Sequence, residues 1–176
     1  MAAAVNPPAD GIALDGLERA WHHIERATKD GSDREARFNM MSASMQGAMA
    51  FQKGLGCVHS LSHSLGGANP KLHHGTLNAI FLPAVIAFNE TAETVRQEDK
   101  LDRLAQAMGL GSGDEVGPSV RAMTERLGLP TRLAPLGVTR AMFPDILKGA
   151  LKDHSHKSNP RVASESDYVA LLDDCM

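Results

Sequence analysis

The feature that most constrains this chain is its helical periodicity. In segment after segment, apolar residues recur at steps of three and four, and no stretch of useful length alternates apolar with polar residues. Aromatic residues make up only 4% of the chain, whereas alanine, leucine and methionine, which favour helix over strand, are plentiful. The sequence therefore predicts an all-α fold, a bundle-like array of about seven or eight helices.

The periodic segments place the expected helices along the chain. Glycine, proline and aspartate clusters separate them, as at 30–33, 66–70 and 128–130. The expected helices cover roughly residues 9–29, 36–49, 57–65, 75–88, 101–108, 116–127, 142–151 and 169–172. We expect Ser164 or Ser166 to cap the last helix, and 133–138 to be a loop.

The second expected helix carries a stripe of methionines. Met40, Met41, Met45 and Met49 recur at helical spacing, together with alanines. Methionine is a flexible side chain that fills irregular gaps in cores. We therefore predict that this stripe is core filler rather than a cofactor-binding surface.

Charge, length and cysteine content exclude several classes of protein. The chain has 176 residues, 18 Lys+Arg and 21 Asp+Glu, so its formal net charge of -3 favours neither a nucleic acid nor an anionic membrane as partner. No apolar run reaches the ~18 residues of a membrane span, and Met1 to Val5 lack the features of a signal peptide. Cys57 and Cys175 are too few for a disulfide framework. We therefore expect a cytoplasmic protein.

Histidines mark the segment in which chemistry is most expected. His59 and His63 are four residues apart, which places both imidazoles on one face of a helix. His73 and His74 follow a glycine and proline break that can turn the chain back toward that face. Neutral imidazole is a common ligand of divalent transition metals. The pattern suggests a metal site, although spacing alone also fits an ordinary polar helix face.

Other histidines carry weaker signals. Glu18 and His22 form a carboxylate–imidazole pair at helical spacing, which we expect on a helix surface. His154 and His156 flank Ser155 near the C-terminus, and we expect both to be solvated. The glycine-rich pieces at 54–56 and 109–113 follow no strand, which makes them poor candidates for nucleotide phosphates.

Two consecutive blocks resemble a known signature. Residues 54–67 read GLGCVHSLSHSLGG, and residues 73–83 read HHGTLNAIFLP. This order of glycines, paired histidines, His-Gly and Asn-Ala resembles the signature of the iron-containing alcohol dehydrogenases. Asn6-Pro7-Pro8-Ala9-Asp10 and Asn159-Pro160-Arg161 extend the likeness, so that essentially the whole chain resembles the C-terminal helical domain of that family.

The resemblance implies a division of roles among three histidines. His59 and His74 match two of the family's metal ligands, and Fe²⁺, or Zn²⁺ or another divalent ion, is the implied metal. His63 matches the histidine that lies beside the nicotinamide and substrate and helps to relay a proton, so it is implied both in catalysis and in cofactor binding. His73 matches no functional position. The implied substrates are small alcohols or aldehydes, with NAD(P) as the hydride carrier in a complete enzyme.

The sequence also departs from the family pattern. The family's other two ligands lie in an Asp-x-x-x-His motif, and no such motif occurs in residues 1–176. No nucleotide-binding α/β domain is present, so we expect a single helical domain at 1–176 whose isolated activity is absent. Two histidines alone should hold a metal weakly, since a catalytic site usually has about three protein ligands.

Two other functions stay open at this point. In the first, the chain is a non-catalytic remnant or a helical interaction module that keeps the fold of the family. In the second, it is an unrelated helical protein for metal storage or sensing. A face left by the absent nucleotide-binding domain should be apolar and exposed, which predicts a homo-oligomer.

Overall fold

The computed structural model describes residues 1–176 and contains helices but no strands. The all-α prediction is confirmed. There are nine α-helices: α1 Pro7–Lys29, α2 Arg34–Ala50, α3 Gly56–Ala68, α4 His74–Asn89, α5 Glu93–Gln97, α6 Lys100–Met108, α7 Val116–Arg126, α8 Phe143–Lys152 and α9 Glu165–Cys175. The sequence did not predict α5, because its five residues are too few to show a helical period.

Helix starts follow the capping residues that the sequence offers. Asn6 caps α1 and Asp33 caps α2, each by accepting a hydrogen bond from a backbone N–H in the first turn. Ser164, the first of the two serines considered, caps α9 in a capping box with Asp167. The helix therefore begins at Glu165, about a turn before the apolar segment that predicted it. The expected loop at 133–138 contains one short 3-10 turn.

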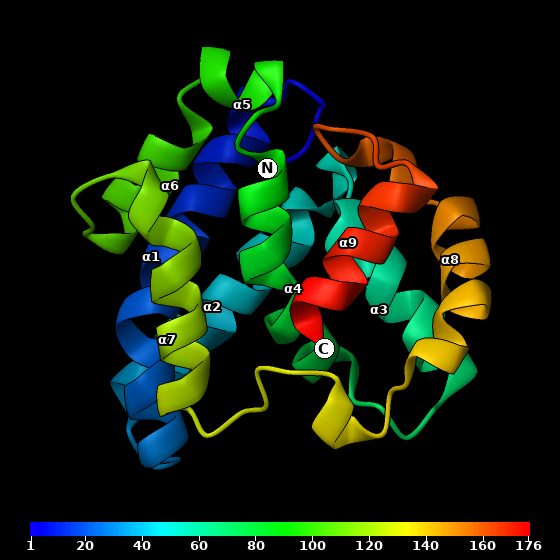
Figure 1. Ribbon diagram of the computed structural model, residues 1–176. Helices are drawn as coiled ribbons and strands as arrows, with labels where there is room; N and C mark the ends of the chain where they lie inside the picture. Colours follow the sequence, from blue (N-terminus) through cyan, green and yellow to red (C-terminus); the bar gives the residue numbers. More distant parts are fainter.

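The helices form two groups on either side of α4 (Figure 1). The helices α1, α2, α6 and α7 lie on one side, and α3, α8 and α9 lie on the other. Helix α4 contacts α7 in the first group and both α3 and α9 in the second. The larger core contains 20 buried residues, drawn mainly from α3, α4, α8 and α9. A smaller cluster joins α4 to α6 and α7.

The prediction that the methionine stripe of α2 fills the core is wrong. Met41 is 70% exposed, and Met45 and Met49 are exposed too, as is Phe38 on the same side of the helix. Instead α2 buries Ala36 and Ala43. It packs on α1 next to Gly16, where an added Cβ would lie 3.0 Å from the Cβ of Gln46. The two helices meet through small residues, and the large side chains of α2 point away.

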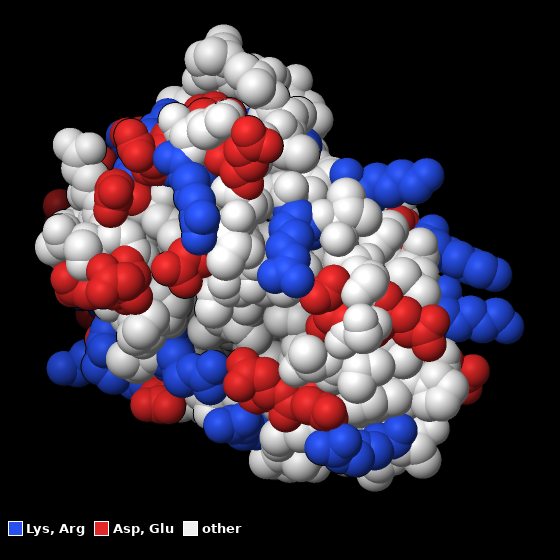
Figure 2. Space-filling view, turned by 45° about the horizontal axis from the view of Figure 1, so that its top comes forward, with Lys and Arg blue, Asp and Glu red and all other residues white.

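Acidic and basic side chains are mixed over most of the face shown in Figure 2, among wide uncharged areas. This mixture agrees with a nearly balanced composition and a net charge of -3. None of the helices is both long enough and apolar enough to cross a membrane.

Candidate metal centre

Helix α3 carries two of the site histidines, and its start is fixed by a segment about one hundred residues later in the chain. The backbone N–H of Gly56 donates to Ser158 Oγ at 3.1 Å, and that of Cys57 donates to Asn159 Oδ1 at 3.2 Å. Asn159 is itself buried and donates to Asn89 Oδ1. Ser158 and Asn159 therefore satisfy two backbone donors in the first turn of α3 that no residue of α3 satisfies.

Two glycines allow this close approach. Gly54 and Gly56 have φ values of 96° and 72°, in the left-handed region that favours glycine. A Cβ at Gly54 would overlap the side chain of Ser158, and one at Gly56 would lie 2.6 Å from Asn159 Oδ1. Their function is thus structural, as the absence of a preceding strand suggested.

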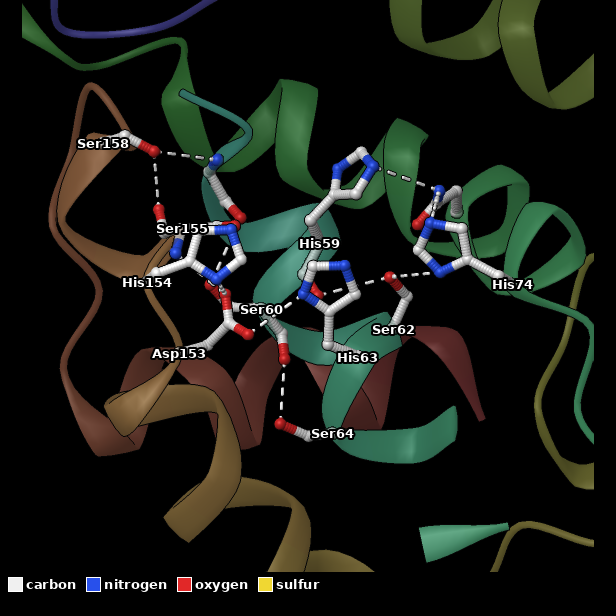
Figure 3. Close-up of polar contacts among 12 residues, drawn as sticks. His59, Ser60, Ser62, His63, Ser64, His74, Asp153, His154, Ser155 and Ser158 are labelled. Carbon is white, nitrogen blue, oxygen red and sulfur yellow. Dashed lines mark hydrogen bonds and ion pairs between the residues drawn. The ribbon is translucent and has the colours of Figure 1, made fainter. Parts of the chain in front are cut away.

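The structure brings the three predicted histidines together, as Figure 3 shows. His59 and His63 project from successive turns of α3, and His74 is the first residue of α4. The ring centroids lie 5.5 Å apart for His59 and His63, 5.2 Å for His59 and His74, and 5.3 Å for His63 and His74. The break at 69–73 therefore returns the chain to the histidine face of α3.

Two ring nitrogens in this group converge on one point. The side-chain nitrogen of Asn78 lies 3.4 Å from His59 Nε2 and 3.0 Å from His74 Nε2. An amide N–H₂ only donates, so both Nε2 atoms act as acceptors and carry their lone pairs toward it. Nδ1 of His59 and Oδ1 of Asn78 are buried without a hydrogen-bond partner. Two lone pairs aimed at a common place fit a divalent metal ion, for which this chain would supply two nitrogen ligands.

The electrostatics favour the neutral form of these two rings. Burial lowers the pKa of His59 below its usual range, and the neighbouring His74 and His63 lower it further. Burial also lowers the pKa of His74, with smaller contributions from His63 and His73. A neutral imidazole has a free lone pair, which is the form that binds a metal ion.

His63 has a different partner. Its Nδ1 lies 3.0 Å from Oδ2 of Asp153, the residue that follows α8. The carboxylate accepts a hydrogen bond from Nδ1–H, so Nε2 is the nitrogen that carries the lone pair of the neutral ring. Burial alone would raise the pKa of Asp153, but hydrogen bonds from the Ser155 backbone and from His63 outweigh it and hold that pKa below its usual value.

The remaining histidines divide into those near this group and those apart from it. His154 stacks on His63 with ring centroids 5.7 Å apart and is solvated, as predicted. His156 is buried and bonded through Nδ1 to the hydroxyl of Tyr168 at 2.9 Å, so the prediction that it is solvated is wrong. His73 accepts a hydrogen bond from the backbone of Thr76 and caps α4.

Glu18 and His22 are both exposed on α1, as expected for a surface pair. Two residues of the site had no role in the sequence analysis. Asn78 was noted only as part of a motif, and Asp153 was not noted at all. In the sequence, the only sign that Asp153 belongs to the site is its position directly before His154. Its contact with His63 depends on the fold, which brings the end of α8 next to α3.

The comparisons with known proteins agree with one another. The model of the C-terminal part of the Fe-containing alcohol dehydrogenase family matches residues 1–176. The chain is 61% identical over 180 residues to a 4-hydroxybutyrate dehydrogenase of Cupriavidus necator, covering all of this chain and 47% of that protein. It is 34% identical to a 1,3-propanediol dehydrogenase of Klebsiella pneumoniae, covering 95% of this chain and 44% of that protein.

Solved structures give the same result. The crystal structure of a 1,3-propanediol oxidoreductase superposes with a TM-score of 0.91 at 30% identity, covering 99% of this chain and 47% of that one. An alcohol dehydrogenase from Oenococcus oeni gives a TM-score of 0.92 at 26% identity, with the same coverage. The chain spans about half the length of the relatives that it matches. This excludes the alternative of an unrelated metal-storage protein, and the chain belongs to the iron-containing alcohol dehydrogenase family, matching its C-terminal helical part.

Proposed function

We propose that the chain is the metal-binding part of an NAD(P)-linked alcohol dehydrogenase that also reduces aldehydes. The observation that carries this proposal is the convergence of His59 Nε2 and His74 Nε2 on one amide nitrogen, and the lowered pKa of both rings favours their neutral form. These two histidines would hold the metal, for which Fe²⁺ is the first candidate and Zn²⁺ the second. When bound, the ion supplies Lewis-acid chemistry that polarises the alcohol or carbonyl oxygen.

His63 is the residue that we assign to proton transfer and to contact with the nicotinamide. Asp153 accepts from its Nδ1–H, which fixes the ring and leaves Nε2 free to take the alcohol proton. The ring lies on the same side of α3 as His59 (Figure 3) and is 34% exposed, so solvent and substrate can reach it on that side. In the reverse reaction the same nitrogen returns a proton to the oxygen.

Hydride transfer needs more than this chain offers. The binding site for NAD(P) and the two further metal ligands would lie in the part of the relatives that the chain does not match. We therefore propose that the isolated chain is inactive, and that a nucleotide-binding domain is its functional partner. The name of the 61% identical relative makes 4-hydroxybutyrate, a primary alcohol with a carboxylate, the first substrate to test.

A complementation experiment tests this function. The chain is mixed with, or fused to, the N-terminal half of the Cupriavidus necator relative, and NAD(P)H formation from 4-hydroxybutyrate and simple primary alcohols is followed. We expect activity only from the combination. We expect His74→Ala to lower it at least about a hundredfold, since it removes a direct ligand. His22→Ala, an exposed histidine on α1, is the matched control.

Two results would contradict the proposal. Activity of the chain alone would show that the nucleotide-binding part is not needed. A combination that binds NAD(P) and metal yet remains inactive would favour the alternative of a non-catalytic remnant.

Self-association and location belong to the same proposal. The exposed side of α2 with Phe38, Met41 and Met45 supports a homo-oligomer, because large apolar patches on soluble chains are often interfaces. Light scattering that gives a monomer mass at high concentration would rule this out. Cys57 and Cys175 are both unpaired, which supports the cytoplasm as the compartment.

A further inference from the structure

A second group of metal-ligating side chains lies beside the pair His59 and His74. It consists of His63, Asp153 and His154, which each offer one ligand atom, all within 4.8 Å of one another. The group draws on α3 and on the two residues that follow α8, as Figure 3 shows. None of its members is a ligand in the site proposed above.

The distances in this group are close to those of a metal site. Nδ1 of His63 lies 3.0 Å from Oδ2 of Asp153, and Nδ1 of His154 lies 3.7 Å from Oδ1 of the same carboxylate. Metal–ligand bonds of about 2.1 Å place neighbouring ligand atoms roughly 3.0–3.4 Å apart. The first pair is already at that separation, and the second needs a shift of well under about 1 Å. The ligand atoms of the two histidines lie within 4.8 Å of each other, and rotation of the exposed His154 ring would bring them closer.

The three side chains combine an oriented carboxylate with an imidazole that is open to solvent, which suits capture of an ion. Asp153 is only 13% exposed, and its Oδ1 accepts a hydrogen bond from the Ser155 backbone at 2.8 Å, which orients the carboxylate. His154 is 77% exposed and can rotate toward that carboxylate. Its Nε2 lies near the hydroxyl of Ser155, so Nδ1 is the nitrogen turned toward Asp153.

We propose that His63 Nδ1, the Asp153 carboxylate and His154 Nδ1 form a second site for a divalent transition metal such as Zn²⁺. Two imidazoles and one carboxylate are a ligand set typical of zinc and of iron(II), with the open positions filled by water. This site is complete within the chain, whereas the pair His59 and His74 has two ligands here. The isolated chain should therefore hold its first ion at this second site.

Occupation of this site would change the tautomer of His63. A metal on Nδ1 takes the lone pair of that nitrogen, so the ring proton moves from Nδ1 to Nε2. The metal-bound ring then has no lone pair on Nε2. If the proposed function holds, excess zinc would therefore inhibit proton transfer by His63 in the complemented enzyme.

Calorimetric titration of the full chain with Zn²⁺ tests the site without any assay of activity. We expect His154→Ala and Asp153→Asn each to weaken binding at least about tenfold, because even residues behind a direct ligand are worth about 10- to 100-fold. His22→Ala should bind like the unchanged chain, since it removes an exposed histidine elsewhere. The double variant with His59→Ala and His74→Ala should retain the affinity.

The outcomes separate this site from the one under the proposed function. If His154→Ala binds as tightly as His22→Ala, or if the unchanged chain takes up no zinc, the second site does not exist. If instead only the double variant at His59 and His74 loses the ion, the ion belongs to that pair and the inference is wrong. Long-range ¹H–¹⁵N spectra of the histidine rings give an independent check. Zinc should move the His63 signals to those of a ring protonated on Nε2, and a ring still protonated on Nδ1 would overturn the proposal.

Discussion

The half of the molecule formed by α3, α4, α8 and α9 and the half that begins with α1 and α2 place their apolar side chains differently. In the first, large residues such as Leu61, Phe81 and Tyr168 are fully buried in one core. In the second, α2 exposes Met41 and Met45 and buries alanines. All the candidate metal ligands lie on the first half. The candidate ligands, which must keep fixed distances from one another to share an ion, thus lie on the better packed part of the chain.

The largest expected effect tests this contrast directly. Leu61→Ala removes a fully buried side chain from α3 between His59 and His63, and we expect it to lower the free energy of unfolding by about 2–5 kcal/mol. Met45→Ala removes a similar volume from the exposed side of α2, and at a dilution where the chain is monomeric we expect a change below about 0.5 kcal/mol. Urea unfolding followed by circular dichroism measures both. Equal losses for the two variants at that dilution would mean that the methionine side of α2 is covered within the monomer itself.

The same contrast explains what the sequence could and could not predict. Periodicity located eight of the nine helices, because each has enough apolar residues to reveal its period. Periodicity also predicted that the methionines share one face of α2, but it does not predict which face of the helix packs on α1. Gly16 on α1 and Ala43 on α2 decided that question by allowing close approach.

The site was predictable to a similar extent. His59 and His63 share a face of one helix, so their proximity follows from spacing alone. His74 reaches them through a local turn, which the glycines and the proline at 66–70 predicted. Asp153 and the buried state of His156 depend on how α8 and α9 pack on α3, and no local pattern carries that information.

A smaller effect is expected for a polar contact in the packed half. Tyr168→Phe leaves His156 Nδ1 buried without its partner, which should cost about 1–3 kcal/mol of stability. Arg26→Ala in the other half removes ion pairs to Asp33 and Glu35 at 2.8 and 2.9 Å that are open to solvent, and we expect little change. Thermal unfolding compares the two. A larger loss for Arg26→Ala would reverse the ranking of the two halves.

Capping of α9 gives a still smaller effect. Ser164→Ala removes the hydroxyl that accepts from the Asp167 backbone, and we expect a loss of about 1 kcal/mol. Ser166→Ala, two residues on, keeps the cap bond and should be close to neutral. Chemical denaturation distinguishes them, and similar values for both would mean that the cap adds nothing to the packing of α9.

The smallest expected effect is on the loss of stability at acid pH that depends on Asp167. The backbone N–H and hydroxyl of Ser164, helped by Arg161, hold the pKa of Asp167 below its usual value. A carboxyl with a lowered pKa stabilises the folded state fully above its ordinary pKa, near 3.8, and that contribution is lost as the pH falls through the folded value. Stability measured from about pH 5 to pH 3 should therefore fall less steeply in Asp167→Asn than in the unchanged chain. Asp167 is partly exposed and Arg161 is exposed, so salt should weaken the contribution of Arg161 but leave the bonds from Ser164. If the two acid curves run parallel, the capping box holds α9 by its neutral hydrogen bonds alone.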